Sequence, residues 1–425
     1  MTDIHFSWNE KSSTASSIDT DSDRIDDEKW IETQIRKIQN RQLGSPLELF
    51  NLMDLWNLKG KDKVILNDIF IDTQFRKVIP LFDSSVLMEL ITKPGDGTTS
   101  DDYYSIKTRL SENLYDIFFD GPGCFILKNA YPVALMEDFN FWCEQMIAGK
   151  ECEGDKGSVN SQNVSKDKNF IHPTQKGKYL INDVLSRLAS TNPSLLYQLL
   201  YDSNGAYVIH WLIDVLLGFG KIGAAAAHWI TPNSNTRQFS HVDFPLNINS
   251  SPFWGMCVEK MKKITTKKQL NDFLPHYSCQ ALIATDPMDE KNGSTEVIPC
   301  SQVIPNVDLA ISKGSKFYEG LEKAGMFVNV ELDQGDVLIF NRRLIHRGGA
   351  NQSDRHRNAL IMQYVWLWGV GQEILDIDTI VPKLIEVHEN IKKEDREKQK
   401  QYREDFKGFI ARINPPYPKD TRLGT

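Results

Sequence analysis

Residues 335–368 read GDVLIFNRRLIHRGGANQSDRHRNALIMQYVWLW, and this alternation of turns and apolar runs predicts two strands of a sheet. The opening Gly-Asp turn leads into the apolar run 337–340, and a turn rich in Gly, Asn and Ser precedes a longer apolar run, 358–368. His346 follows the first run, and Arg357 stands immediately before the second. Two polar side chains with defined chemical uses therefore border the predicted strands.

A second feature, His241-Val242-Asp243, lies well upstream. Side chains two apart on a strand point the same way, so His241 and Asp243 would converge on one ion while Val242 packs behind them. A non-haem Fe(II) centre needs two imidazoles and one carboxylate on one face of the metal, which leaves the other face open for a co-substrate and dioxygen. The apolar strand before His346 could bring that histidine back to the pair. We therefore predict a metal site made of His241, Asp243 and His346.

Arg357 lies eleven residues beyond His346, where the turn gives way to the second strand. An arginine that points into the interior is costly unless it meets an anion, and its planar fork suits a carboxylate. Arg355 is the rival candidate, but it still belongs to the turn. We predict that Arg357 binds a dicarboxylate co-substrate.

Together these residues resemble the phytanoyl-CoA dioxygenase family of Fe(II)/2-oxoglutarate oxygenases. In that family a His-x-Asp pair, a distal histidine and an arginine eleven residues later form the site. Residues 120–128 look like the family's opening strand, Gln238 stands three residues before the first histidine as is common there, and residues 292–301 resemble its mid-barrel hairpin. The resemblance covers roughly residues 119–370.

The resemblance implies a mainly β fold with flanking helices, a double-stranded β-helix of the jelly-roll, cupin-like type. It also implies Fe(II) on His241, Asp243 and His346, with 2-oxoglutarate and O2 as co-substrates. Arg357 and Gln238 would be the residues that bind 2-oxoglutarate. The implied reaction is hydroxylation of a small organic substrate with release of succinate and CO2.

The chain departs from the family pattern at three places. Cys300-Ser301-Gln302 stands where Gly-Ser-His is frequent, Gly348 stands where a Ser or Thr usually follows the distal histidine, and a Trp near Leu282 is missing. The absent hydroxyl at Gly348 removes a plausible second hydrogen bond to 2-oxoglutarate. None of these departures touches the predicted metal ligands.

Two other classes of function remain open. One is a non-catalytic binding or regulatory protein on the same scaffold, which would have no need to keep all three ligands. The other is a different cupin-type metal enzyme that does not use 2-oxoglutarate, which would leave Arg357 unexplained. Within the family, desaturation or epimerisation could replace hydroxylation, whereas Asp243 disfavours halogenation, which requires a small residue there.

The amino-acid composition narrows the class of function and the cellular compartment that we expect. The formal net charge of −8 argues against nucleic-acid binding, which calls for a basic surface. The six cysteines include no Cys-x-x-Cys pair, so we expect reduced, buried thiols in a cytosol-like compartment. No stretch is long and apolar enough for a membrane span, and residues 1–27 do not resemble a signal peptide. We predict a cytoplasmic protein whose partner is a small-molecule substrate.

The chain divides into four predicted parts. Residues 1–27 are polar and acidic and predict a disordered tail, residues 28–118 predict a helical extension, residues 119–370 form the oxygenase domain, and residues 371–425 predict a charged helical extension. Within the third part, the polar segment 150–168 predicts a mobile loop, which is either an inert insertion or a lid over the site.

Three further motifs have an ordinary and a functional interpretation. Residues 218–223 spell a dinucleotide fingerprint, but a helical run precedes them and a strand follows, so a glycine turn that ends a helix explains them better. Arg342 and Arg343 are expected to be solvated, with contact to an anionic substrate as the alternative. His228 is expected to be an ordinary core or surface histidine, with a position facing the pocket as the alternative.

Overall fold

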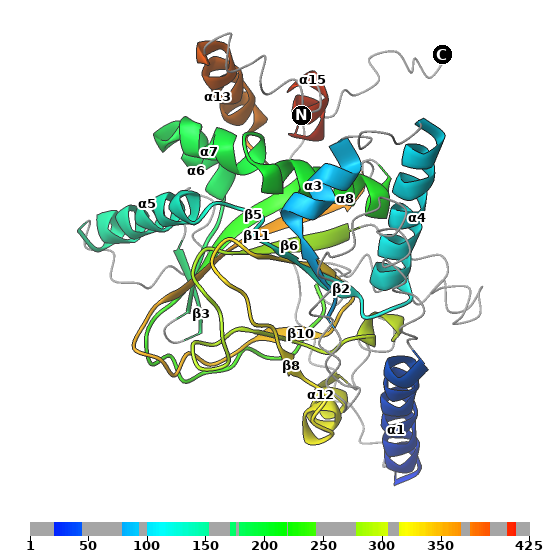
Figure 1. Ribbon diagram of the computed structural model, residues 1–425. Helices are drawn as coiled ribbons and strands as arrows, with labels where there is room; N and C mark the ends of the chain where they lie inside the picture. The colour runs from blue at the N-terminus through cyan, green and yellow to red at the C-terminus, as the bar shows by residue number, and fades with distance from the viewer. Residues whose placement is uncertain are drawn as a thin grey trace, which may run out of the picture.

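The computed structural model describes residues 21–44, 79–92, 100–152, 171–175, 178–218, 220–243, 278–304, 314–366, 375–391 and 406–413. Two β-sheets form its centre (Figure 1). The large sheet has the strand order β1-β2-β9-β6-β11-β5-β4-β3, and the small sheet has the order β10-β7-β8. Every neighbouring pair is antiparallel except β1 with β2, which is parallel.

The strands of the large sheet are β1 (Leu81–Asp83), β2 (Cys124–Lys128), β3 (Ile171–Gln175), β4 (Lys178–Ile181), β5 (Gly220–Ile230), β6 (Ser278–Ala284), β9 (Val337–Asn341) and β11 (Arg357–Trp366). Those of the small sheet are β7 (Thr295–Val297), β8 (Val328–Asn329) and β10 (His346–Gly348). The predicted class, β-sheets with flanking helices, is confirmed at this level.

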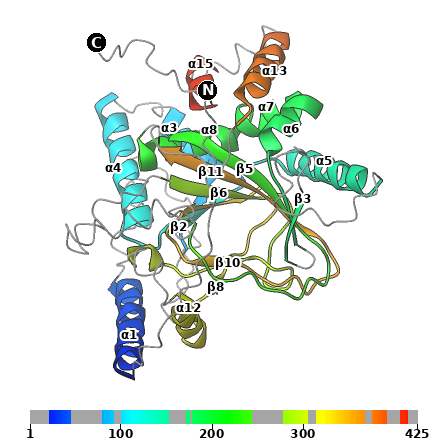
Figure 2. The same cartoon turned by 180° about the vertical axis from the view of Figure 1, so that it is seen from behind.

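Most helices gather on one side of the large sheet, as both views show (Figures 1 and 2). They are α3 (Ser84–Thr92), α4 (Ser100–Phe119), α5 (Val133–Cys152), α6 (Val184–Thr191), α7 (Pro193–Leu200), α8 (Asn204–Leu217), α13 (Ile377–Asn390) and α15 (Phe406–Ile413). The helices α1 (Asp21–Gly44) and α12 (Gly314–Lys323) lie on the other side, beyond the small sheet. The large sheet therefore has one face toward most of the helices and the other toward the small sheet.

Side-chain alternation along β11 separates the two cores. Leu360, Met362 and Tyr364 belong to the core beneath the helices, whereas Ala359 belongs to the core between the sheets, with Ile361 packed against it. Because successive side chains of a strand point to opposite faces, Arg357 is on the same face as Ala359. Arg357 therefore faces the space between the two sheets.

The N-terminal part differs from its predicted organisation in two ways. Residues 28–118 are not purely helical, because β1 joins the edge of the large sheet through parallel pairing with β2. Helix α1 begins at Asp21, inside the segment 1–27 for which we expected disorder. An acidic first turn interacts favourably with the helix dipole, so a composition typical of disordered tails also suits a helix N-terminus. Residues 1–20 lie outside the described residues.

Two helical boundaries also differ from expectation. Helix α5 runs through Gly149 to Cys152, so residues 150–152 are helical and not part of the expected loop 150–168, whose other residues lie outside the described residues. A glycine inside a helix costs about 1 kcal/mol, which tertiary packing readily offsets. The apolar run 195–217 forms two helices, α7 and α8, because the Ser203 hydroxyl accepts a hydrogen bond from the amide of Ala206 and starts a new helix.

The predicted hairpin at residues 292–301 is wrong. Gly293 does turn the chain, with a φ of 84°, but β6 belongs to the large sheet and β7 to the small one. Strand β7 also ends at Val297, and Cys300 adopts a left-handed φ of 67° that precedes a short 3-10 helix. The chain therefore crosses here from one sheet to the other.

The C-terminal part is more closely packed than a solvated helix. Ile380 and Leu384 of α13 are fully buried, as is Phe409 of α15.

Helix α8 ends at Leu217 and β5 begins at Gly220, which confirms the helix-ending turn predicted for residues 218–223. None of the described helices is long and apolar enough to span a membrane. Among the described cysteines, Cys124, Cys143, Cys279 and Cys300 are buried free thiols, as expected.

Candidate metal centre

The two histidine-bearing segments lie side by side at the edge of the small sheet. The backbone amide of His241 donates to the carbonyl of His346, and the amide of His346 donates to the carbonyl of His241, both at 3.0 Å. The amide of Asp243 then donates to the carbonyl of Arg342 at 2.9 Å. This short antiparallel pairing brings together residues that are far apart in the sequence.

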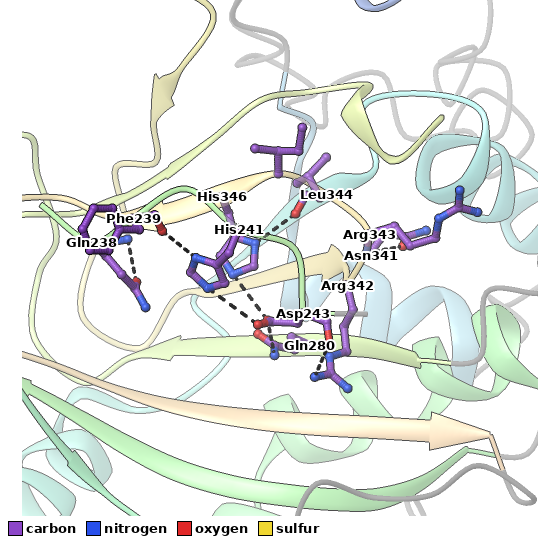
Figure 3. Close-up of polar contacts among 12 residues, drawn as sticks. Gln238, Phe239, His241, Asp243, Gln280, Asn341, Arg342, Arg343, Leu344 and His346 are labelled. Atoms are coloured by element: carbon purple, nitrogen blue, oxygen red, sulfur yellow. Dashed lines mark hydrogen bonds and ion pairs between the residues drawn. The ribbon is translucent and has the colours of Figure 1, made fainter. Parts of the chain in front are cut away.

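The side chains of His241, Asp243 and His346 converge (Figure 3). Nε2 of His241 lies 3.6 Å from Oδ1 of Asp243, and Nε2 of His346 lies 3.3 Å from Oδ2. One ligand atom from each of the three residues lies within 4.8 Å of the others. Val242 points away from them and packs against the core that contains Ile345, as the strand alternation predicts.

The hydrogen bond that Nδ1 of each imidazole makes determines which ring nitrogen is available to a metal. Nδ1 of His241 lies 2.8 Å from the carbonyl of Phe239, and Nδ1 of His346 lies 2.9 Å from the carbonyl of Leu344. A carbonyl oxygen only accepts hydrogen bonds, so each Nδ1 carries the proton. The lone pair of each neutral ring is therefore on Nε2, directed at the cluster, which is the arrangement that a metal-binding histidine requires.

A residue of the large sheet completes the surroundings of Asp243. Nε2 of Gln280, on β6, donates to Oδ2 of Asp243 at 2.6 Å, so the cluster lies between the two sheets. The sequence analysis missed Gln280. Its only signal was an amide side chain within the otherwise apolar residues 279–284.

The electrostatics favour an ionised Asp243. Burial acts to raise the pKa of its carboxyl, but His346, His241 and the nearby Arg342 outweigh it and hold that pKa well below its usual range. Burial and the adjacent His346 lower the pKa of His241. Burial also acts to lower the pKa of His346, but Asp243 reverses this and raises it. A bound cation would compete with the proton on His346 for the same lone pair.

These residues fit a divalent first-row metal. Two neutral imidazole nitrogens and one carboxylate oxygen suit Fe(II) and related ions, and these atoms lie within 4.8 Å of one another. The hydrogen bonds from Nδ1 of both rings and from Gln280 hold the donor atoms in place before an ion arrives.

An ion-pair network supports both histidine segments. Nε of Arg347, next to His346, donates to Oε2 of Glu296 at 2.6 Å, and Nε of Arg237 lies 3.1 Å from Oε1 of the same carboxylate. The guanidinium of Arg347 also lies 3.9 Å from the centre of the Phe327 ring. One buried carboxylate on β7 therefore ties β10 to the chain that leads into His241.

The two residues predicted to bind 2-oxoglutarate are held by other parts of the chain. Arg357 is buried, and its guanidinium donates to the carbonyl of Gly293 at 2.5 and 3.2 Å through two nitrogens. Gln238 uses its side-chain oxygen to accept from the amide of Gly348 at 3.0 Å. Arg355 is exposed, as expected of a turn residue.

The expected solvation of Arg342 and Arg343 is wrong, because both side chains are buried. Nη2 of Arg342 donates to the carbonyl of Asp243 at 3.1 Å, whereas Nη2 of Arg343 donates to the carbonyl of Ile304 at 3.3 Å. Figure 3 shows Arg343 directed away from the histidines. Two adjacent arginines at the end of a strand look like surface charge in the sequence, but Asp243 pairs with Arg342 and Ile304 contacts Arg343, so segments that are distant in the sequence lie against both.

The fold and the site define a protein with two imidazoles and one carboxylate converging between two β-sheets. Residues 268–359 match the family model described as phytanoyl-CoA dioxygenase (PhyH). The stretch that carries His346 and Arg357 is thus similar to the phytanoyl-CoA dioxygenase family.

Comparison with individual proteins gives one curated relative and several solved structures. The chain is 35% identical over 95 residues to the dioxygenase lolE1 of Epichloe uncinata, a match that spans 22% of this chain and 34% of that relative. AviO1 from Streptomyces viridochromogenes has a TM-score of 0.42 and 17% identity, over 61% of this chain and 96% of that one. The non-heme alpha ketoglutarate dependent epimerase SnoN from nogalamycin biosynthesis has a TM-score of 0.40 and 15% identity, over 61% and 82% of the two chains.

Proposed function

We propose that the protein is an Fe(II)/2-oxoglutarate-dependent dioxygenase that hydroxylates a small organic substrate and releases succinate and CO2. The observation that carries this proposal is the convergence of His241, Asp243 and His346, with Nδ1 of both rings held by backbone carbonyls and Nε2 of both rings directed at the cluster. The match of residues 268–359 to the phytanoyl-CoA dioxygenase family supports it independently.

We propose in addition that the two sheets are the two halves of a double-stranded β-helix. The hydrogen bond from Gln280 on the large sheet to Asp243 beside the small sheet supports a closed arrangement, because it crosses the space between them. The ring contact of Phe340 on β9 with His346 on β10, at 5.0 Å between centroids, crosses the same space.

In this proposal His241, Asp243 and His346 hold Fe(II), which with O2 and 2-oxoglutarate supplies the oxidising power for an unactivated C–H bond. The chain itself keeps Asp243 ionised and orients both rings. The ring of Phe340 packs against the ring of His346 on one side of the cluster, at 5.0 Å between centroids.

Arg357 and Gln238 would bind 2-oxoglutarate. Arg357 is buried and on the face between the sheets, and its present partner is a neutral carbonyl. A carboxylate is a stronger acceptor for a guanidinium, because both groups are charged and the fork allows two parallel bonds. Gln238 still has its Nε2 donor beside Gly348, where the family's usual hydroxyl is missing.

The test is the dependence of succinate formation on both Fe(II) and 2-oxoglutarate, with purified protein and a panel of acyl-CoA esters, amino acids and natural products. His346→Ala serves as the inactive control. Metal binding without 2-oxoglutarate binding would favour a different cupin-type metal enzyme. Absence of both would favour a non-catalytic protein on the same scaffold.

A further inference from the structure

Arg342 is a buried cation that forms no ion pair among the residues that the structure describes. Its side chain is only 1% exposed, and the bond from Nη2 to the carbonyl of Asp243 is its one described hydrogen bond. The Nε of Arg342 is buried with no partner at all. Within the described residues, no carboxylate lies within ion-pair distance of this guanidinium.

Some buried arginines of this chain are compensated by a carboxylate, whereas Arg343 and Arg357, within the described part of the chain, bond only to backbone carbonyls, as Arg342 does. Arg347 donates to Glu296 at 2.6 Å, and Arg412 binds both oxygens of Asp214 at 2.6 Å. A buried charge without a partner is expensive, which makes an uncompensated guanidinium a poor structural element. Arg342 differs from Arg343 in its position, because its guanidinium lies beside Asp243 of the candidate metal cluster.

Binding of a metal would leave the positive charge of Arg342 with still less negative charge nearby to offset it. Among the described residues, Asp243 is the carboxylate that acts on Arg342, and a bound cation would offset the negative charge of Asp243. The guanidinium would then keep its own positive charge in a buried place. An anion that arrives with the substrate would satisfy both this charge and the unpartnered Nε.

The position of Arg342 separates it from the proposed 2-oxoglutarate site. Asn341, the residue before it, pairs with Cys279 near the start of β6, whereas Ala359, two residues beyond Arg357, pairs with Ala284 at the end of β6. The two buried guanidinium groups therefore approach the space between the sheets from opposite ends of one strand. Two separate anions could be bound on either side of the metal cluster.

We propose that Arg342 is a substrate-binding residue that receives a carboxylate, so that the substrate of this enzyme is an organic acid. The inference rests on the proposed function, because it assumes that Asp243 serves a metal. A single planar guanidinium matches the charge and shape of one carboxylate. A phosphate would call for further basic groups, and the neighbouring Arg343 does not supply one because its guanidinium bonds to Ile304.

The probe for this site is acetate, the smallest carboxylate that has an apolar end, labelled with ¹³C at the carboxyl carbon. The full chain is loaded with Mn(II) instead of Fe(II), which prevents turnover, and is saturated with 2-oxoglutarate. Paramagnetic broadening of the acetate signal then reports binding close to the metal. Metal content, 2-oxoglutarate binding and thermal unfolding are measured on the same samples.

Three variants are compared with the wild type. Arg342→Met removes the charge, Arg342→Lys keeps the charge without the fork, and Arg343→Met is the matched control at an adjacent buried arginine. We expect saturable broadening in the wild type and in Arg343→Met. Arg342→Met should weaken acetate binding by about ten- to a hundred-fold, with a smaller loss in Arg342→Lys.

Two results would overturn the inference: no saturable broadening in the wild type, or equal broadening in the wild type and both Arg342 variants. If Arg342→Met fails to fold or to hold Mn(II), the comparison with Arg342→Lys decides. A wild-type protein that binds no Mn(II) would overturn the proposed function together with this inference. Binding of Mn(II) and 2-oxoglutarate without an effect of Arg342 on acetate would overturn this inference alone.

Discussion

Gln280 on the large sheet donates a 2.6 Å hydrogen bond to the carboxylate of Asp243 beside the small sheet. Outer residues of this kind orient a metal ligand, and their loss commonly reduces metal affinity by about ten- to a hundred-fold. We expect Gln280→Leu to lower the affinity for Fe(II) by that factor while the thermal unfolding temperature changes little. Equilibrium titration with Fe(II) under anaerobic conditions measures the effect. Gln334→Leu, which removes an amide that binds the carbonyl of Thr285, is the control, and equal affinities in both variants would refute the role of Gln280.

Removal of a proposed metal ligand should have a larger effect. His346→Ala leaves one imidazole and one carboxylate, so the variant should lose stoichiometric iron and all succinate formation. The circular dichroism spectrum should stay close to that of the wild type, because the backbone bonds between residues 241 and 346 do not need the ring. His356→Ala, at an exposed histidine, is the control. Unchanged iron content in His346→Ala would contradict the assignment.

Arg357 makes a distinct prediction about 2-oxoglutarate. Loss of a charge-assisted contact at a buried site should cost about 2 to 4 kcal/mol, which is about thirty- to nearly a thousand-fold in Kd. Arg357→Ala should show this loss, and Arg357→Lys should show much of it because the paired geometry is gone. Iron affinity should stay the same, and Arg355→Ala should bind 2-oxoglutarate normally. If Arg355→Ala is the impaired variant instead, the role assigned to Arg357 is wrong.

His210 should make the fold sensitive to acid. Burial, with a contribution from Arg412, lowers the pKa of His210 to about 3. The unfolded chain, with an ordinary pKa near 6.5, then binds a proton that the folded chain does not, so stability is present above that pH and falls as pH drops toward 3. The free energy of unfolding should fall by about 1.4 kcal/mol per pH unit from this group alone.

Denaturant titrations at several pH values measure this slope. His210→Leu should flatten it, whereas His356→Ala, at an exposed histidine, should leave it unchanged. Identical pH profiles for the wild type and His210→Leu would show that His210 is not the group responsible.

Local pattern was enough to predict several elements of the fold. The apolar runs around β9 and β11, the left-handed glycine at Gly335 and the helix-ending turn before β5 are all visible within a few residues. Alternation along a strand likewise predicted that His241 and Asp243 share a side while Val242 packs behind them. Each of these features depends on backbone periodicity or on turn chemistry, which short segments carry by themselves.

Only the tertiary structure decided which segments meet. Contacts between distant segments decide three features of this protein. Strand β1 joins the large sheet, β6 and β7 belong to different sheets, and Gln280 reaches Asp243. The burial of Arg342 has the same origin, because the chain that covers it is remote in the sequence. A period of two residues tells which side of a strand a residue takes, but the choice of neighbouring strand is made by the packing of the whole chain.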